Sequence, residues 1–310
     1  MQTIAKIGLN PLPWVSTASG FELTLPVLRK AFSEIRTTPF KAIHADPVAG
    51  QTAGEYRQLL AEYGLVPAPG YFAALFHETP TTDIVEAAKR HAALQAELGN
   101  TEVFIAASRD PSRSELPAVG AGFDAAALER VIDRLGEAAT AITAEGVRPV
   151  LHPHVGTRIE VEDDVHAVLA GVEESVLGFG PDTGHLSWAG MDTVKIMTQY
   201  ADRIGAMHLK DVHLDQAQSA RAAGTTYDDS TRSGRFTIWT EPGRGDVDLV
   251  GALAALPASF TGWIVVEVDV PEAPPNLEST QISAAWIEDH FGANAFTAHE
   301  GSADRKQDGR

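Results

Sequence analysis

The stretch RPVLHPHVGTRIEVEDDVHAVLAGVEESVLGFGPDTGHLSW (Arg148–Trp188) carries the pattern on which the fold prediction depends. A short apolar run, Arg148–His152, is followed by Glu162–Val172, where apolar residues recur at three- and four-residue spacing. A second short run, Ser175–Phe179, then starts the same pattern again. Short runs bounded by Gly, Pro, Asp or Asn are typical of buried strands, and the longer spacing is typical of amphipathic helices. The stretch therefore predicts a strand–helix–strand unit.

The same alternation continues outward in both directions. Further strands are predicted at Ile4–Leu9, Ala42–Ala45, Val66–Tyr71, Glu102–Ala106, Ile204–Leu209 and Trp263–Val268. Further helices are predicted at Thr81–Leu98, Asp124–Ala144 and Met191–Asp202. Strict alternation of strands and helices implies a parallel sheet, and eight such units in 310 residues favour a closed barrel over an open sheet. We therefore predict an α/β fold with a single (β/α)8 TIM barrel over residues 1–292.

Three segments depart from this rhythm. A long polar connection, Asp211–Arg244, follows the seventh strand, and loops of this length are usually lids or binding loops. Residues 293–310 are polar and are expected to form a disordered tail. The glycines of GRGDVD (Gly243–Asp248) lack a preceding strand and the spacing of a phosphate-binding loop, so we expect Asp246 to cap the following helix.

Composition excludes several classes of function. Acidic residues outnumber basic ones 42 to 24, giving a net charge of −18, so a nucleic acid partner is not expected. No apolar run reaches the roughly 18 residues of a membrane-spanning helix, and the start MQTIAKIGLNPLPW does not resemble a signal peptide. The lack of cysteine excludes disulfides and thiolate metal sites and fits a reducing compartment. We expect a cytoplasmic protein without a membrane partner.

Polar residues gather at the ends of the last four predicted strands, where a barrel of this kind has its active site. Each of these ends supplies one residue that can bind a metal, and the four are His152, Asp182, His208 and Glu267. Three further polar residues come two positions after one of these: His154 after His152, Lys210 after His208 and Asp269 after Glu267. Each pair shares one side of its strand. Two imidazoles and two carboxylates suit Mn²⁺, Co²⁺, Fe²⁺, Zn²⁺ or, less well, Mg²⁺, and leave positions open for substrate.

Each of these residues also has a purely structural interpretation. Asp182 is placed to cap the next helix, a lone histidine is often hydrogen-bonded scaffold, and Lys210 and Asp211 can form a solvated pair. Glu267 differs, because a carboxylate in an apolar run is costly unless it is paired or binds a metal. Since four neighbouring strand ends each supply a ligand type, the joint pattern favours one divalent metal site.

The motifs resemble those of the xylose-isomerase-like barrel family, which includes sugar isomerases, ketose epimerases, apurinic-site endonucleases and inosose dehydratases. The likeness covers nearly the whole chain and is greatest to the inosose dehydratase branch. The motifs are IGLNPLPW (Ile7–Trp14), PGYF (Pro69–Phe72), LHPHVGT (Leu151–Thr157), DTGHLSWAG (Asp182–Gly190), MHLKDV (Met207–Val212), PGRGDVD (Pro242–Asp248) and GWIVVE (Gly262–Glu267).

By this resemblance, the metal ligands fall on the same four residues, His152, Asp182, His208 and Glu267. The isomerase and epimerase branches generally have Glu at the first position, whereas the dehydratase branch usually has three successive histidines. Here Pro153 replaces the middle one, which leaves open whether His152 or His154 binds the metal. Residues 216–235 form a long insertion, so the substrate is not transferred from the resemblance.

The resemblance implies a lyase that removes a proton beside the carbonyl of a keto-cyclitol or keto-sugar and then eliminates a β-substituent. Mn²⁺ is the ion we expect. Imidazoles titrate near neutral pH, which suits acid–base work. His154 and His185 are the candidate acid and base, Lys210 the candidate for neutralising the enolate oxygen, and Glu160 and Arg158 the candidates for orienting substrate or a catalytic His. Trp14, His44 and Tyr71 are expected to wall the pocket, with packing as the alternative role.

Several other functions stay open. An isomerase or epimerase would use the same enolate, and a deglycosidase would expel the aglycone of a 3-keto-glycoside. Some relatives of the last kind act with a small β-rich subunit, so we expect a homo-oligomer or such a hetero-oligomer. The charge of −18 argues against an apurinic-site nuclease, and the retained ligand set argues against a non-catalytic sugar-binding protein.

Overall fold

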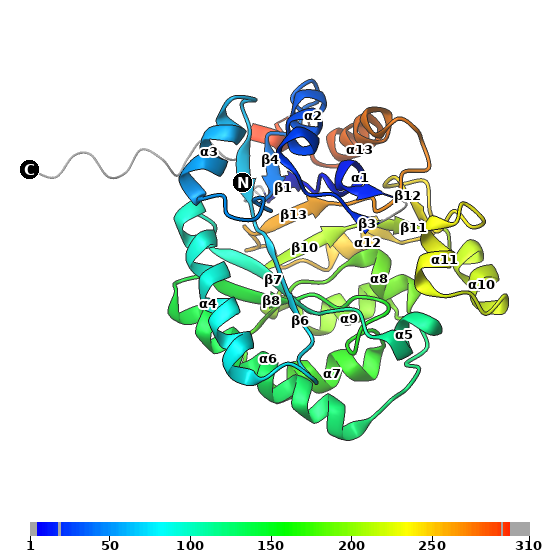
Figure 1. The fold of residues 1–310 in the computed structure, drawn as a ribbon. Helices are drawn as coiled ribbons and strands as arrows, with labels where there is room; N and C mark the ends of the chain where they lie inside the picture. Colours follow the sequence, from blue (N-terminus) through cyan, green and yellow to red (C-terminus); the bar gives the residue numbers. More distant parts are fainter. Residues whose placement is uncertain (1–4, 18–19, 293, 298–310) are drawn as a thin grey trace, which may run out of the picture.

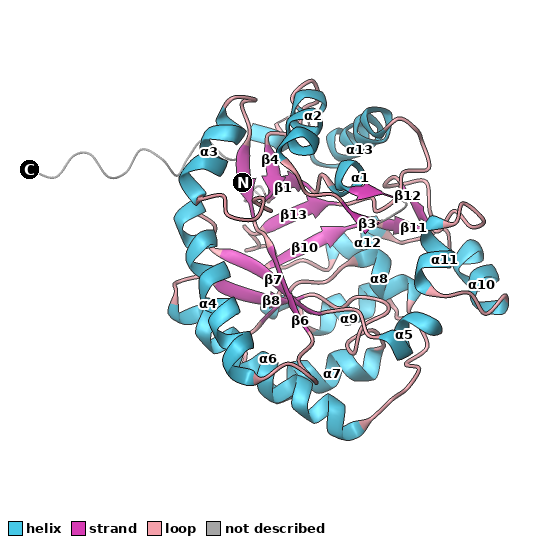
Figure 2. Cartoon of the chain, viewed as in Figure 1, coloured by secondary structure: helices cyan, strands magenta, loops and turns pink. Residues whose placement is uncertain are grey.

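A parallel barrel of strands forms the centre of the computed structural model, which describes residues 5–17, 20–292 and 294–297. Figure 2 shows the strands at the centre and the helices around them. The barrel strands are β1 (Lys6–Leu9), β4 (Ala42–His44), β5 (Val66–Ala68), β6 (Tyr71–Ala74), β7 (Glu102–Ala107), β8 (Arg148–Leu151), β9 (Gly178–Phe179), β10 (Ala206–Leu209) and β13 (Trp263–Val266). The predicted α/β barrel is therefore confirmed.

The helices connect successive strands, and most lie on the outside of the barrel (Figure 1). They are α1 (Leu12–Val15), α2 (Leu25–Ile35), α3 (Ala53–Ala61), α4 (Thr81–Leu98), α5 (Pro111–Glu115), α6 (Ala125–Ala144), α7 (Glu162–Gly171), α8 (Thr183–Trp188), α9 (Thr193–Gln199), η1 (Ala201–Arg203), α12 (Leu249–Ala254) and α13 (Asn276–Phe291). No helix in these described ranges is long and apolar enough to cross a membrane.

The strands follow one another around a closed ring. One run of parallel strands has the order β10-β13-β1-β4-β5, and a second has the order β6-β7-β8-β9. Parallel bridges from Phe179 to Ile204 and from Asp182 to His208 join β9 to β10. On the other side, β5 and β6 are two parts of the third barrel strand, so the two runs close into a single barrel with eight strand positions.

The third strand is interrupted between Ala68 and Tyr71, and two buried amide side chains hold the break. Gln95 accepts a hydrogen bond from the Gly70 amide (3.1 Å) and donates one to the Ala45 carbonyl (3.3 Å). Asn100 donates to the Ala68 carbonyl (2.9 Å) and to Gln95 (2.7 Å). These bonds satisfy the Gly70 amide and the Ala45 carbonyl, and they give the Ala68 carbonyl a second donor beside the Ala45 amide (3.2 Å), which keeps Tyr71 in place at the barrel rim.

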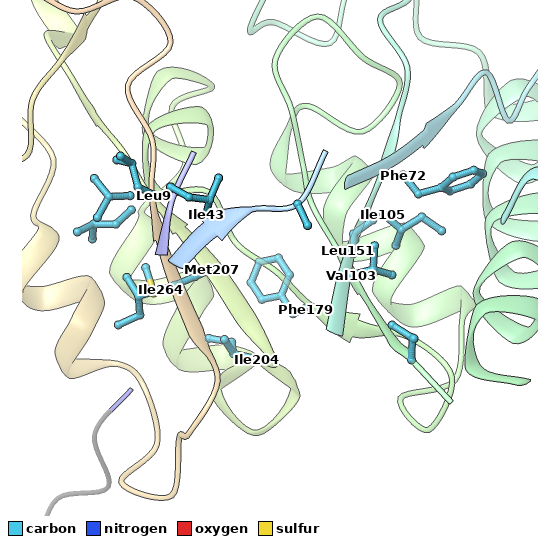
Figure 3. Close-up of a cluster of buried hydrophobic side chains, with 14 of the residues drawn as sticks. Leu9, Ile43, Phe72, Val103, Ile105, Leu151, Phe179, Ile204, Met207 and Ile264 are labelled. Atoms are coloured by element: carbon cyan, nitrogen blue, oxygen red, sulfur yellow. The ribbon is translucent and has the colours of Figure 1, made fainter. Parts of the chain in front are cut away.

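Side chains of the barrel strands alternate between two apolar layers, as the two-residue period of a strand requires. One layer lies inside the barrel and contains Ala42, Ala68, Phe104, Val150, Ala206, Trp263 and Val265. The other lies between strands and helices, and Figure 3 shows part of it, including Leu9, Ile43, Val103, Ile105, Leu151, Met207 and Ile264. Both layers are buried, so one sheet supports a core on each side.

The connection after the seventh strand is more ordered than a polar loop. It contains β11 (Asp211–Val212), α10 (Leu214–Ala222), α11 (Tyr227–Arg232) and β12 (Trp239–Thr240), and β11 pairs with β12 in antiparallel fashion. Its own apolar cluster includes Ala217, Ala220, Ile238 and Trp239, packed with Val155 and Trp188 of the barrel. In Figure 1 this unit, which we call the β11–β12 cover, lies at the end toward which the barrel strands point.

Two smaller predictions are corrected. Asp248, not Asp246, caps α12, because the Gly251 amide donates to its carboxylate (2.8 Å), whereas Asp246 accepts from the Leu214 amide (2.8 Å) at the start of α10. Within the segment 293–310, η2 (Ala295–Thr297) is ordered, since Phe296 is buried against Phe40 with ring centroids 5.0 Å apart. Residues 293 and 298–310 lie outside the described part of the chain, as do residues 18–19 between β2 (Ser16–Thr17) and β3 (Gly20–Phe21).

The strand break predicts that Gly70 does not tolerate a larger residue. A Cβ at this position would lie 2.5 Å from the Ala45 carbonyl oxygen and would overlap the Gln95 amide. We expect Gly70→Ala to lower the free energy of unfolding by about 1–3 kcal/mol, the usual cost of overpacking. Gly54→Ala in α3 is the matched control, because nothing lies within 4 Å of its added Cβ. Chemical denaturation of both variants tests this, and equal stability of the two would contradict it.

Candidate active site

A cavity of about 420 Å³ opens at the C-terminal ends of the barrel strands. Its inner part is lined by His44, Tyr71, His152, His154, His208, Glu267 and Asp269. Its outer part is lined by residues from β3, from the segment after β7 and from the β11–β12 cover. The predicted location of the site, at the strand ends, therefore coincides with a cavity in the structure.

The two-residue period of each strand carries the polar residues into the barrel. On four strands, a polar residue follows an interior apolar residue by two positions. The pairs are Ala42 and His44, Val150 and His152, Ala206 and His208, and Val265 and Glu267. The apolar residues form a dry floor, and the polar ones form the next layer above it. Phe104 fills the centre of this floor, with its ring centroid 4.2 Å from that of His208.

β9 reaches the same layer with glycines at its interior positions. A Cβ on Gly180 would approach Val150 to 2.7 Å and Phe104 to 3.0 Å. Glycine at this position therefore leaves room for the floor, and Asp182 follows two residues later at the level of the candidate ligands.

The ammonium group of Lys210 is the centre of the polar layer. Its Nζ lies 2.7 Å from Asp269, 2.8 Å from Glu267 and 3.2 Å from Asp182. Lys210 and Asp211 are fully buried, so the alternative interpretation of these two residues as a solvated pair is wrong. Three carboxylates surround one ammonium group, and these four side chains together carry two negative charges when the carboxylates are ionised.

The four predicted metal ligands meet beside this group. Oδ2 of Asp182 lies 3.7 Å from Nδ1 of His208 and 3.9 Å from Nε2 of His152. Nδ1 of His208 lies 2.7 Å from Oε2 of Glu267. Possible ligand atoms of Asp182, His208 and Glu267 lie within 4.8 Å of one another, as do those of His152, Asp182 and His185. His154 belongs to neither group, so the geometry favours His152 as the ligand.

The helix-cap interpretation of Asp182 holds for only one of its oxygens. Oδ1 accepts a hydrogen bond from the His185 amide at the start of α8 (2.9 Å). Oδ2 is buried and lies 3.2 Å from Nζ of Lys210. The same carboxylate therefore caps the helix and presents a second oxygen to the cluster.

The charges of the cluster shift its pKa values strongly. Burial opposes ionisation of Lys210, Asp182 and Glu267, but their mutual attraction outweighs it and favours the charged form of each. Burial also lowers the pKa of His208, yet the charges of Glu267 and Asp182 raise it to about 9. Burial raises the pKa of Asp269 to about 7, against the opposing effect of Lys210. The cluster thus attracts cations, including protons.

These residues fit a divalent cation. The buried carboxylates exceed the ammonium group by two charges, and burial lowers the pKa of His152, which keeps its imidazole neutral and able to bind a metal. Buried ring nitrogens without hydrogen-bond partners among the described residues include Nδ1 of His152 and Nε2 of His208. Buried groups of this kind require partners, and a dication among them would supply both contacts and charge.

His154 and His185 form a stacked pair at the edge of the cluster. Their ring centroids are 3.7 Å apart, and burial lowers the pKa of both, that of His154 to about 4. Nδ1 of His154 lies 2.7 Å from the Val155 carbonyl, which can only accept, so Nδ1 carries the proton and Nε2 keeps a free electron pair. His154 lines the cavity, whereas His185 lies behind it against Trp239.

Six predicted site residues do not line the cavity. Asp182, His185 and Lys210 are buried behind its wall, and three others, Trp14, Arg158 and Glu160, point elsewhere. Nε1 of Trp14 donates to Glu34 (2.8 Å), outside the barrel. Arg158 donates to Asp110 (3.0 Å) and to the Gly122 carbonyl (2.7 Å). The predicted pocket-wall role of Trp14 and substrate-orienting role of Arg158 are corrected accordingly, because both side chains are committed elsewhere. His44 and Tyr71 do line the cavity as expected.

Glu160 is the third predicted site residue whose side chain points away from the cavity. Its buried carboxylate accepts hydrogen bonds from Arg113 (3.1 Å) and from the amides of Gly156 (2.8 Å), Ala118 (3.1 Å) and Gly120 (2.9 Å). With both oxygens engaged and no place in the cavity lining, it is not positioned for catalysis. Instead it fixes the loop that follows His154.

Other cavity residues were missed by the sequence prediction. Asn10 donates to Glu267 (2.9 Å) from the end of β1, and Arg109 lies just beyond β7, so a systematic search of strand ends would have identified both. Tyr227, Arg232 and Trp239 come from the β11–β12 cover, and no sequence pattern indicates that they point into the cavity.

The glycine-rich PGRGDVD segment also has a defined role. Its amides of Gly243 (2.9 Å), Gly245 (3.0 Å) and Val247 (3.1 Å) donate to the carboxylate of Asp211. The loop therefore binds a carboxylate of its own chain instead of a phosphate. Because Asp211 directly follows Lys210, this interaction fixes the backbone beside the cluster.

The cluster predicts binding of a divalent cation that is measurable without turnover. Added Mn²⁺ should raise the melting temperature of metal-free protein, since an ion that binds only the folded state stabilises it. Asp182→Asn should weaken binding by at least about 100-fold, because even outer partners of ligands contribute roughly 10- to 100-fold. Affinity should rise as the pH increases through about 9, the pKa of His208, because the metal competes with the proton on this imidazole.

The control for this experiment is Asp246→Asn. Asp246 belongs to a third group of possible ligands, with His213 and Asp215, but this group is partly exposed. Calorimetric titration with Mn²⁺ should give the wild-type affinity for this variant. An unchanged affinity in Asp182→Asn would contradict the proposed ligand set.

Comparisons with known proteins identify the family to which this fold belongs. A sequence profile of the family described as "Xylose isomerase-like TIM barrel" matches residues 31–290. The chain is 25% identical over 280 residues to inosose dehydratase of Geobacillus thermodenitrificans, covering 87% of this chain and 92% of that protein. It is 32% identical over 151 residues to inosose dehydratase of Lactiplantibacillus plantarum, a match that spans 48% of this chain and 49% of that protein.

Solved structures share the fold at lower identity. A D-allulose 3-epimerase from Methylomonas sp. has a TM-score of 0.65 at 15% identity, covering 93% of this chain and 98% of that one. The IOLI protein with a bound zinc atom has a TM-score of 0.65 at 16% identity, covering 94% and 99%. With a profile match over most of its length and the same barrel, the chain belongs to the xylose isomerase-like TIM barrel family.

Proposed function

We propose that this protein is a divalent-metal-dependent lyase that eliminates water from a cyclic or sugar-derived polyhydroxy ketone. The observation that carries this proposal is that His154, with a free Nε2, lines the same cavity as Glu267 and Asp269. Behind the cavity wall, the carboxylates of Glu267 and Asp269 bind the buried ammonium group of Lys210 beside Asp182. Such a site combines a base with fixed positive charge, which is what proton removal next to a carbonyl requires.

His154 is the proposed base. Its Nδ1 proton is held by the Val155 carbonyl, so Nε2 is the nitrogen that accepts the proton from the carbon next to the carbonyl. The ring is held from behind by His185, and Glu160 binds the amide of Gly156 in the adjacent loop. These contacts orient the imidazole before substrate arrives, which lowers the cost of reaching the transition state.

Lys210 is the proposed partner of the developing negative charge. Its ammonium group is buried and fixed by three carboxylates, so it does not need to reorganise when the substrate oxygen gains charge. A divalent ion held by His152, Asp182, His208 and Glu267 would act as a Lewis acid toward the same oxygen. Asp269 lines the cavity beside Lys210 and is the proposed proton donor to the departing hydroxyl group.

Elimination is favoured over isomerisation by the relatives of known activity that align over most of their length. The inosose dehydratase of Geobacillus thermodenitrificans is covered to 92%, and that of Clostridium beijerinckii to 97%. The epimerase structure shares only 15% identity, which supports the fold alone. Both reactions begin with the same proton removal, so they differ in what happens to the enolate.

The direct test incubates Mn²⁺-loaded protein with 2-keto-myo-inositol. We expect a product that has lost one water molecule, detected by its dicarbonyl absorbance and by mass spectrometry. His154→Gln should lower kcat by about 100- to 10,000-fold, the usual contribution of a general base, without changing Mn²⁺ affinity. His166→Gln is the control, because His166 bonds to Tyr200 on the outer surface of the barrel.

Two results would contradict the lyase proposal. Turnover of free ketoses to isomers of unchanged mass, with no reaction of 2-keto-myo-inositol, would indicate an isomerase or epimerase. Full activity of His154→Gln would remove His154 from the reaction.

A second candidate function is the β-elimination of an aglycone from a 3-keto-glycoside. The outer part of the cavity favours it, because Phe21, Leu23 and Val270 give it an apolar lining and Phe21 is 65% exposed. The guanidinium of Arg232 covers the Phe21 ring at 5.3 Å and links it to the β11–β12 cover. A polar sugar ring would bind at the floor of such a cavity and an apolar group at its mouth.

Phe21→Ser separates the two candidates. For an aryl 3-keto-glucoside the substitution should raise KM by about tenfold. This is the effect of losing most of the contact between the aryl group and the ring of Phe21, which the bound ligand would cover. For 2-keto-myo-inositol, which has no apolar group, KM should stay within about twofold of wild type. An equal effect on both substrates would argue against the aglycone-binding role of the mouth.

A further inference from the structure

The wall of the cavity opposite Asp182 carries two polar side chains that the proposed reaction does not use. They are His44, the last residue of β4, and Asp46, two residues beyond it. Going around the barrel in either direction, β4 lies four strand positions from β9, which leads to Asp182. A ligand bound at the Asp182 side therefore presents its far edge to this wall.

Neither side chain is committed to another part of the protein. Nδ1 of His44 is buried and has no hydrogen-bond partner in the described ranges, although the residue is only 4% exposed. The carboxylate of Asp46 has no ion pair and no hydrogen bond to any described residue, and it is open to the cavity. In the same cavity, the other two carboxylates, Glu267 and Asp269, are both held by Lys210.

The backbone around Asp46 is nevertheless fixed. Its amide donates to the hydroxyl of the fully buried Tyr56 (3.4 Å), and the neighbouring Ala45 carbonyl is held by Gln95 (3.3 Å). The ring of His44 lies edge-on to that of His208 with centroids 5.8 Å apart, and 6.5 Å from that of Tyr71. A free carboxylate on a rigid backbone is pre-organised to accept hydrogen bonds from a ligand.

We propose that Asp46, with His44 beside it, is the hydroxyl-recognition subsite of this protein and binds adjacent hydroxyl groups on the edge of the substrate farthest from Asp182. A carboxylate offers two acceptor oxygens, which match two neighbouring hydroxyl donors. The inference rests on the proposed function for the choice of a polyhydroxy ketone. Asp46 acts here in binding and selectivity, not in the chemical step.

The test compares Asp46→Asn and Asp46→Ala with Asp163→Asn. Asp163 is also exposed but lies on α7, outside the cavity, so its variant makes the same change in charge elsewhere. For Mn²⁺-loaded protein we expect both Asp46 variants to raise KM for 2-keto-myo-inositol by about tenfold or more, the loss associated with hydrogen bonds to a charged acceptor. Their kcat should stay within about threefold of wild type, since the reacting groups are untouched.

A binding measurement makes the inference independent of turnover. Calorimetric titration with myo-inositol, which lacks the carbonyl group and does not react, should show the same loss of affinity in the Asp46 variants and none in Asp163→Asn. If wild-type protein binds myo-inositol through Asp46 but does not convert the ketone, the proposed reaction fails and the subsite stands. Unchanged KM and myo-inositol affinity in the Asp46 variants, or no binding of myo-inositol by wild type, would overturn the subsite.

Discussion

The burial of Lys210 among Asp182, Glu267 and Asp269 is the interaction on which the rest of the site depends. An isolated charge in this position would be strongly destabilising, so the ammonium group and the carboxylates require one another. Three carboxylates against one ammonium group leave an excess of negative charge that no described residue balances except a protonated His208. The excess charge therefore favours binding of a further cation, in competition with the protons of His208 and Asp269.

The apolar floor beneath this cluster strengthens its attraction for a cation. Phe104, Val150 and Val265 exclude water from the barrel centre, and the interior glycine Gly180 leaves space for these side chains. In such surroundings the effective dielectric is low, so the attraction between charges and the cost of an unpaired one both increase. The backbone above is equally restricted, because the PGRGDVD amides bind Asp211, which directly follows Lys210. The cluster is thus held from below and from the side before any ligand binds.

Much of this arrangement is predictable from the sequence because strands impose a strict geometry. The two-residue period places His208 with Lys210 and Glu267 with Asp269 on one side, and the parallel order of the strands brings their ends together. Beyond the strand ends this regularity stops. Trp14, Arg158 and Glu160 lie in connecting segments, where each side chain follows its local hydrogen-bond partners, Glu34, Asp110 and Arg113. The β11–β12 cover was predicted only as a long lid or binding loop. Its helices were not predicted, since they pack on Trp188 and Val155, which are distant in sequence.

The division between strands and connections also separates chemistry from selectivity. The proposed reacting groups lie at the ends of β8, β10 and β13, on a sheet that cannot shift without disrupting both apolar layers. The groups around the outer cavity, Phe21, Tyr227 and Arg232, come from connecting segments that can change without affecting the barrel. With this construction, the connecting segments can vary while the proposed reacting groups on the strands keep their positions. The epimerase and the zinc-bound neighbour share only the barrel with this chain. On this argument, we expect its substrate to be determined by residues in connecting segments, such as those of the β11–β12 cover.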